Sequence, residues 1–329
     1  MMNVTFLKNK LLAIAVLALP FALPISTVKA EDAWPKQPIT LVVPQSPGSV
    51  ADLMARVLSK PLGDLLHQTI VVDDRPGASG AIAAQEVARA QPDGYTILVG
   101  SVSTNGGLLS AIDKSLPYDQ LNDFIPITQI NDAPLILITS PKTGINNLNE
   151  LVKEARVRPN ELTYASAGNS SGSRFVVELL RQEGKLHMRH IPYRAPAEAV
   201  RAVVAGEATL GAPSLPSAQT LIANGQVIAL AVTSKERSPL FPDVPTTTEL
   251  GFPTAVFYNW TGLFAPAGTS QTIVDKFSDA ARKALTDPAV VKIIKESGAN
   301  PIGHPPQEFS SFVHSEVNKW EKAVTGSGI

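Results

Sequence analysis

The stretch ITLVVPQSPGSVADLMARVL, residues 39–58, reads as a β-strand followed by a short turn and an α-helix. Its first residues are β-branched or apolar, which favours a buried strand, and its later apolar residues recur at helical spacing. The turn, residues 45–49, carries no bulky side chain. A bare helix N-terminus has free N–H groups and a partial positive charge, so it is suited to receive an anion.

A second unit of the same kind occurs at residues 162–180, LTYASAGNSSGSRFVVELL. It again places a turn of small residues between a strand and a helix. The segments that follow the two units also appear in the same order along the chain. This repetition of pattern predicts two α/β lobes with one topology, and two bare turns that face one ligand.

Strand-like and helix-like segments alternate through the chain. The strand-like segments are 39–44, 69–74, 95–100, 134–140, 162–167, 208–213 and 227–234, and the helix-like segments are 49–66, 81–90, 148–157, 173–184 and 196–206. This alternation predicts parallel sheets covered by helices. In open α/β sheets ligands bind at the carboxyl ends of the strands, so two such lobes would form a ligand cleft between them.

Residues 1–30 have the composition of a secretory signal peptide. Lys8 and Lys10 precede an apolar run that is shorter than the roughly 20 residues of a membrane span. Small residues at the end of the run predict cleavage after Ala30 and export to the periplasm. A membrane-spanning helix is the competing interpretation of this segment.

Composition narrows the function classes. The formal net charge is −1, which argues against general nucleic-acid binding. The chain has no cysteine, so disulfides and a lipid-anchored N-terminal cysteine are excluded. His187 and His190 are three residues apart, which puts them on opposite faces of a strand, and no other cluster has metal-ligand spacing. We therefore expect no cofactor and no metal.

Residues 168–172 match the pattern G-x-S-x-G in a strand–turn–helix context, which is the setting of a nucleophile elbow. A serine hydrolase that uses Ser170 is therefore a rival interpretation. It would need an acid and a histidine further along the chain, and the sequence places neither in a distinctive loop. The simpler interpretation is a turn whose hydroxyls and amides hold a ligand.

Two charged residues stand in the first turns of the helices after the bare turns. Asp52 has an ordinary explanation, because a carboxylate there compensates the helix dipole and caps the turn. Arg174 is electrostatically unfavourable at a helix N-terminus, which makes it a candidate for ligand contact. A guanidinium can bind a carboxylate through two hydrogen bonds, so Arg174 points to a carboxylate ligand.

These motifs together resemble the Bug family, the periplasmic solute-binding proteins of tripartite tricarboxylate transporters. The resemblance covers essentially the whole chain after residue 30. It is carried by WPKQPITLVVPQSPGSVADLMAR (34–56), DDRPGASGAIAAQEVARAQPDGYTILVG (73–100), SLPYDQLNDFIPIT (115–128), YASAGNSSGS (164–173), LAVTSKERSPLFPDVPTTTELGF (230–252) and WTGLFAPAGT (260–269).

The resemblance implies a two-lobed periplasmic-binding-protein fold of the second type, with a ligand cleft between the lobes and no catalysis. We expect residues 31–127 and 235–329 to form the first lobe and residues 128–234 the second. The implied ligand is a small carboxylate, and the implied partners are integral-membrane transporter subunits. We expect a monomer. A sensor that serves a signalling system would have the same pocket and a different partner, and the sequence does not separate the two.

The predicted ligand-binding residues are Ser46, Gly48, Ser49, Asp52, Ser103, Ser166, Gly168, Asn169, Ser170, Ser171, Arg174, Ser214 and Tyr258. Family members often have further glycines or a threonine where this chain has residues 49–51, and a histidine where it has Arg174. These departures leave the ligand open among di- and tricarboxylates, aromatic dicarboxylates such as terephthalate, and neutral amides such as nicotinamide. Arg174 favours a ligand with two carboxylates.

Overall fold

The computed structural model describes residues 34–169 and 171–327, without the side chains of residues 324–327. The chain divides into two units, Met1–Trp34 and Pro35–Ile329. The predicted signal peptide, residues 1–30, and Ser170 lie outside the described residues. All elements named below belong to the second unit.

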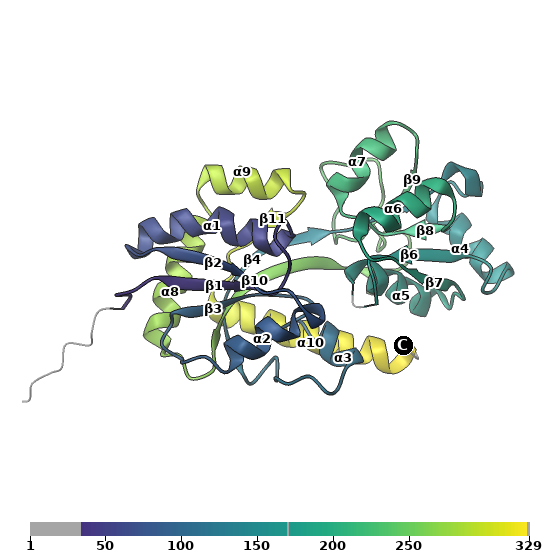
Figure 1. Cartoon of the computed structure of the whole chain (residues 1–329). Helices are drawn as coiled ribbons and strands as arrows, with labels where there is room; N and C mark the ends of the chain where they lie inside the picture. Colours follow the sequence, from purple (N-terminus) through teal and green to yellow (C-terminus); the bar gives the residue numbers. More distant parts are fainter. Residues whose placement is uncertain (1–33, 170, 328–329) are drawn as a thin grey trace, which may run out of the picture. The chain divides into compact units, whose positions relative to one another are not determined.

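The first sheet has six strands in the order β11-β4-β10-β3-β1-β2 (Figure 1). They are β1 Ile39–Val43, β2 Ile70–Asp74, β3 Thr96–Ser101, β4 Phe124–Pro134, β10 Tyr258–Pro266 and β11 Asn300–Pro301. β1 pairs in parallel with β2 and β3, and β10 runs antiparallel between β3 and β4. β1 is nearly all buried, which explains its continuous rather than alternating apolar sequence.

The second sheet has five strands in the order β7-β6-β8-β5-β9. They are β5 Ile136–Thr139, β6 Thr163–Ser166, β7 Arg189–Pro192, β8 Leu210–Gly211 and β9 Ile228–Val232. β6 pairs in parallel with β7 and β8, whereas β5 runs antiparallel to β8 and β9. β6 thus occupies the place in the second sheet that β1 has in the first.

The prediction of parallel sheets is therefore correct only for β1 to β3 and for β6 to β8. The antiparallel strands include those that carry the chain out of one sheet and into the other. β4 leaves the first sheet and β10 returns to it, and the two strands pair along almost their whole length. An alternation of strands and helices cannot show this, because strand direction is fixed by tertiary pairing.

Helices cover both sheets. They are α1 Val50–Leu66, α2 Ala81–Ala88, α3 Leu108–Ile112, α4 Leu148–Val157, α5 Gly172–Gly184, α6 Pro196–Ala205, α7 Leu215–Ala223, α8 Gln271–Ala284, α9 Pro288–Glu296 and α10 Pro306–Ser327. Figure 1 shows α1 and α9 on one face of the six-stranded sheet and α2, α3 and α10 on the other. α1 follows β1 and α5 follows β6 directly, as predicted from the two quoted stretches.

The chain changes sheet at Leu135, between β4 and β5. The boundary expected between residues 127 and 128 falls inside β4, a strand of the first sheet. The lobe limits remain a prediction, and this boundary is better placed at Leu135. Thr233 ties the two connecting segments together. Its hydroxyl accepts the N–H of Leu135 at 2.8 Å and donates to the carbonyl of Phe257 at 2.7 Å.

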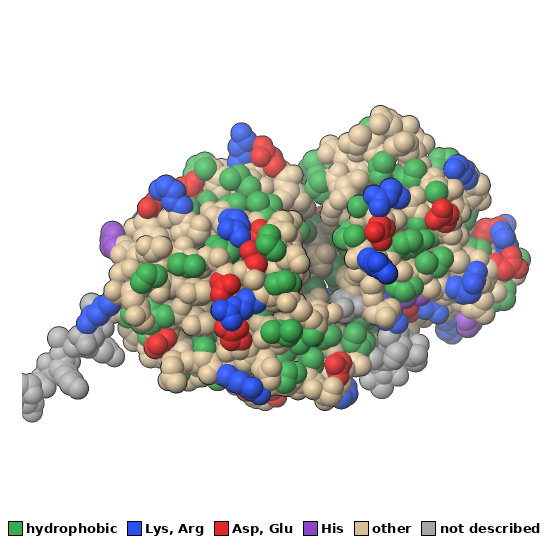
Figure 2. Space-filling model, viewed as in Figure 1, with side chains coloured by type: hydrophobic (Ala, Val, Ile, Leu, Met, Phe, Trp, Pro, Cys, Tyr) green, Lys and Arg blue, Asp and Glu red, His purple; other side chains and the backbone are tan. Residues whose placement is uncertain are grey.

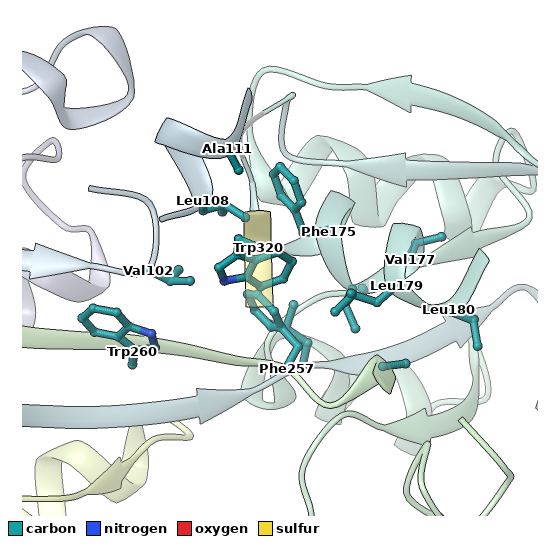
Figure 3. Close-up of a cluster of buried hydrophobic side chains, with 14 of the residues drawn as sticks. Val102, Leu108, Ala111, Phe175, Val177, Leu179, Leu180, Phe257, Trp260 and Trp320 are labelled. Carbon is teal, nitrogen blue, oxygen red and sulfur yellow. The ribbon is translucent and has the colours of Figure 1, made fainter. Parts of the chain in front are cut away.

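An aromatic cluster joins α10 to the start of α5. Trp320 is fully buried and makes edge-to-face contacts with Phe175 on α5, at 5.3 Å, and with Phe257, at 5.8 Å, between ring centroids. Leu108 and Ala111 of α3 lie near Trp320 in the same buried cluster (Figure 3). The side chains of α5 and α10 therefore belong to one hydrophobic core, although they come from distant parts of the sequence.

We expect Trp320→Ala to lower the free energy of unfolding by about 3–5 kcal/mol, because it removes a fully buried aromatic ring and leaves a cavity. Trp320→Phe should cost less, since it keeps part of the ring packing. Denaturant titrations followed by circular dichroism measure both. Lys322→Ala on the exposed side of α10 is the control and should change stability by no more than about 0.5 kcal/mol. A loss in Trp320→Ala as small as the control's would contradict the packing role.

Candidate functional site

The first turn is built by Ser49 and Asp52. Ser49 is the N-cap of α1, and its hydroxyl accepts the N–H of Asp52 at 3.2 Å. The Asp52 carboxylate accepts the N–H of Gly48 at 2.8 Å, and Ser46 accepts the N–H of Ser49 through its carbonyl at 3.1 Å. Gly48 has φ +82°, a left-handed conformation that favours glycine. These hydrogen bonds fix the conformation of the turn.

Asp52 lies under the turn rather than on its surface. It is 4% exposed, and its second oxygen is paired with Arg56. Arg56 also donates to Asp74 at the end of β2 at 2.7 Å. Burial and the neighbouring charge of Asp52 raise the pKa of Asp74, and Arg56 opposes them. The negative charge of Asp52 is therefore compensated by Arg56, and its carboxylate holds the loop through the N–H of Gly48.

The second turn repeats this construction at α5. Ser171 is the N-cap, and its hydroxyl accepts the N–H of Arg174 at 3.3 Å and donates to the carbonyl of Gly168 at 2.7 Å. Asp52 and Arg174 occupy the same helical position, three residues after the cap. Arg174 also turns back to the loop, where its Nη1 donates to the carbonyl of Asn169 at 2.9 Å. Its Nε is buried and has no partner among the described residues.

A serine–histidine pair from β6 and β7 holds the second turn through a hydrogen bond. Ser166 is fully buried at the end of β6, and its hydroxyl lies 2.6 Å from Nε2 of His190 on β7. The same hydroxyl accepts the N–H of Gly168 at 3.2 Å. His190 stacks on Tyr164, with ring centroids 4.8 Å apart. Burial, Arg174 and Arg181 lower the pKa of His190 to about 4, so its ring is neutral at neutral pH.

The first two residues of α1 and of α5 carry backbone N–H groups with no hydrogen-bond acceptor among the described residues. Among the described residues, no acceptor bonds the N–H of Val50 and Ala51 at α1 or of Gly172 and Ser173 at α5. The four groups belong to the first two residues of each helix, where the dipole is positive. They are candidate donors for an anion at the two turns that the sequence singled out, but none of the four residues was among those predicted.

The remaining predicted residues differ in their surroundings. Ser103 is half-buried after β3, and no described residue hydrogen-bonds its hydroxyl. Ser214 is the N-cap of α7, and its hydroxyl lies 2.7 Å from that of Ser217. The Tyr258 hydroxyl accepts the N–H of Lys235 at 2.8 Å, which ties β10 to the return segment. Trp260, further along β10, is 1% exposed and packs into the core.

Figure 2 shows a hollow in the surface between the part that contains the six-stranded sheet and the part that contains the five-stranded sheet. Within residues 34–169 and 171–327, no group of three or more metal-binding side chains is close enough to hold an ion. No helix of these residues has the length and apolarity needed to cross a membrane.

Comparison with known proteins identifies the family. Residues 54–329 match the model of the tripartite tricarboxylate transporter family receptor, TctC. Protein BugT of Bordetella pertussis is 33% identical over 304 residues, which cover 92% of this chain and 93% of BugT.

The chain belongs to the tripartite tricarboxylate transporter receptor family. Two solved structures of this kind are similar along nearly their whole length. R. palustris Rpa4515 with adipate has a TM-score of 0.78 at 31% identity, over 90% of this chain and 99% of the other. MatC (Rpa3494) from Rhodopseudomonas palustris with bound malate has a TM-score of 0.75 at 31% identity, over 88% of this chain and 100% of the other.

The Bug-family resemblance, the two-lobed α/β fold and the solute-binding class are thereby confirmed. The family consists of receptors, so this receptor is not an enzyme. The Ser166–His190 pair is then a structural support: Ser166 is buried, and Glu178, the nearest carboxylate of this network, bonds Tyr164 and Arg181 instead of His190.

The neutral state of His190 predicts a pH dependence of stability. Its folded pKa of about 4 lies below the ordinary value of 6.5, so between these values the unfolded chain binds a proton that the folded chain does not. The contribution of His190 to the free energy of unfolding is fully present above pH 6.5 and is lost as the pH falls towards 4. After allowance for its partial exposure, we expect a loss of about 1–2 kcal/mol.

His190→Gln keeps a polar partner for Ser166 and removes the titrating ring. The difference in unfolding free energy between the wild type and this variant should therefore shrink as the pH falls from 6.5 to 4. Urea titrations at four pH values measure it. A difference that stays constant over this range would show that His190 does not titrate as described.

Proposed function

We propose that this receptor captures a small di- or tricarboxylate in the periplasm and delivers it to the membrane subunits of a tripartite tricarboxylate transporter. The observation that carries the proposal is the set of four N–H groups at the starts of α1 and α5 that have no acceptor among the described residues. Similar receptors hold adipate and malate. Aromatic dicarboxylates such as terephthalate belong to the same chemical class.

The binding chemistry follows from the two turns. One carboxylate of the ligand accepts hydrogen bonds from N–H groups at the helix N-termini, whose positive dipole ends favour the anion. Asp52 does not repel it strongly, because the charge of Asp52 is paired with Arg56 and its oxygens are used in the loop. The ligand favours the conformation in which both turns contact it, through its differential affinity for that state.

Arg174 binds a second carboxylate in this proposal. Its Nη1 is held by Asn169, and its buried Nε has no partner among the described residues, so the guanidinium is oriented but not fully used. An unpartnered buried donor is costly, and a ligand oxygen would satisfy it. Arg174 stands in the first turn of α5, next to the N–H groups that hold the first carboxylate, so its guanidinium can reach the second carboxylate of a short diacid.

A thermal-shift screen of the protein without residues 1–30 tests the proposed ligand class. The panel is malate, adipate, citrate and terephthalate, with nicotinamide as the uncharged comparison. A panel acid present at 100 times its Kd should add about 2.7 kcal/mol of stability. Stabilisation by nicotinamide alone, with none by the acids, would contradict the carboxylate class.

Arg174→Ala should weaken binding of a dicarboxylate by about 2–5 kcal/mol, because it removes one partner of a charged pair. Arg174→Lys should recover only part of this, since an ammonium cannot form the bidentate contact. Calorimetric titration with adipate and with its monoamide measures which carboxylate is involved: a larger loss for the diacid assigns Arg174 to the second carboxylate. Arg201→Ala, which removes an exposed charge from α6, is the control. Equal affinity of Arg174→Ala and wild type would remove Arg174 from the site.

A further inference from the structure

The strand β10 carries an exposed amide side chain, Asn259, at the end nearest the connecting segments. Its neighbour Trp260 points into the α10 side of the sheet, where its Nε1 donates to Glu316 at 3.1 Å. Successive side chains of a strand alternate between faces. Asn259 therefore points to the opposite face, the same one as Thr261.

The Asn259 side chain lies against the first residue of α5. A Cβ built on Gly172 would lie 2.8 Å from Oδ1 of Asn259 and 2.5 Å from Cζ of Phe257. Only glycine allows β10 and its approach segment to come this close to the helix N-terminus. Asn259 is thus a neighbour of the free N–H groups of Gly172 and Ser173, although it belongs to the other sheet.

The amide of Asn259 is available to a ligand. Its Oδ1 end faces Gly172, and within the described part of the chain Nδ2 has no hydrogen-bond acceptor. The polar residues further along this face differ from it. Thr261 is 5% exposed and donates to Asn131, which is fully buried. Thr261 and Asn131 are buried and hydrogen-bond each other, whereas Asn259 is exposed beside the second turn.

We propose that Asn259 is a ligand-binding residue of this receptor, with Nδ2 donating to the carboxylate that the N–H groups of Gly172 and Ser173 hold. This inference rests on the proposed function and adds a contact that comes from β10, a strand of the first sheet, rather than from either turn. The donor is neutral and directional. It therefore selects a carboxylate oxygen at this end of the ligand and discriminates against an apolar or cationic group there.

Asn259→Asp tests the contact with little change of shape, because the two side chains are isosteric and the space beside Gly172 is kept. The variant replaces a donor by a negative charge next to the ligand anion. Its affinity for the panel acid that stabilises the wild type most should fall by at least about tenfold, and that of Asn259→Ala by about three- to tenfold. Calorimetric titration measures both.

Asn224→Asp is the matched control. It adds the same charge after the C-terminal end of α7, at the opposite end of that helix from Ser214, and its affinity should stay within about twofold of wild type. Thermal unfolding without ligand checks that all variants are folded. In wild type labelled with ¹⁵N-asparagine, the Asn259 side-chain amide signals should shift on titration with the same Kd.

The outcomes separate the two proposals. If the wild type binds none of the panel acids, the proposed function fails and this inference fails with it. If the wild type binds an acid but Asn259→Asp binds it equally well, or the Asn259 amide signals do not move, only this inference is overturned. A tenfold loss shared by Asn224→Asp would also overturn it, because the effect would then be one of net charge.

Discussion

The capping of α1 by Ser49 and of α5 by Ser171 is the interaction on which the site depends. Each hydroxyl accepts the N–H of the third helical residue, so the cap satisfies that donor and fixes the direction of the chain as it enters the helix. The first two N–H groups of each helix are left without an acceptor among the described residues. The same bond that stabilises the helix thus leaves two N–H donors at its start without such a partner.

The two turns use opposite charges at the same position to complete this construction. Asp52 satisfies an N–H of the first turn and is neutralised by Arg56. Arg174 donates from Nη1 to a carbonyl of the second turn, and its Nε has no partner among the described residues. A carboxylate at the third residue of a helix is favourable for the dipole, whereas a guanidinium there is not. The cost of Arg174 is understandable if the ligand brings the negative charge that the helix lacks.

Much of the fold could be predicted from local sequence. The helix predicted at residues 148–157 has the same limits as α4, and both strand–turn–helix units occur as expected. Strand direction could not be predicted, because the antiparallel pairing of β4 and β10 depends on contacts between segments more than 120 residues apart. The limit of the first lobe was placed inside β4 for the same reason.

The candidate site was predictable where it depends on local capping and not where it depends on register. Ser49, Ser171 and Arg174 follow from the two turns themselves. The contact of His190 with Ser166 could not be predicted, because it requires the pairing of β6 with β7. Asn259 was not among the predicted residues, whereas its neighbour Tyr258 was. Which of these side chains faces the ligand is set by alternation along β10 and by the close approach at Gly172.

The most direct test of this account is a crystal structure of the receptor with the panel acid that binds it best. The account predicts that one carboxylate of the ligand lies about 2.7–3.2 Å from the backbone nitrogens of Gly172 or Ser173 and of Val50 or Ala51. A ligand bound with no oxygen near these nitrogens, or held only by side chains elsewhere, would contradict the central claim that the N-termini of α1 and α5 form the carboxylate site.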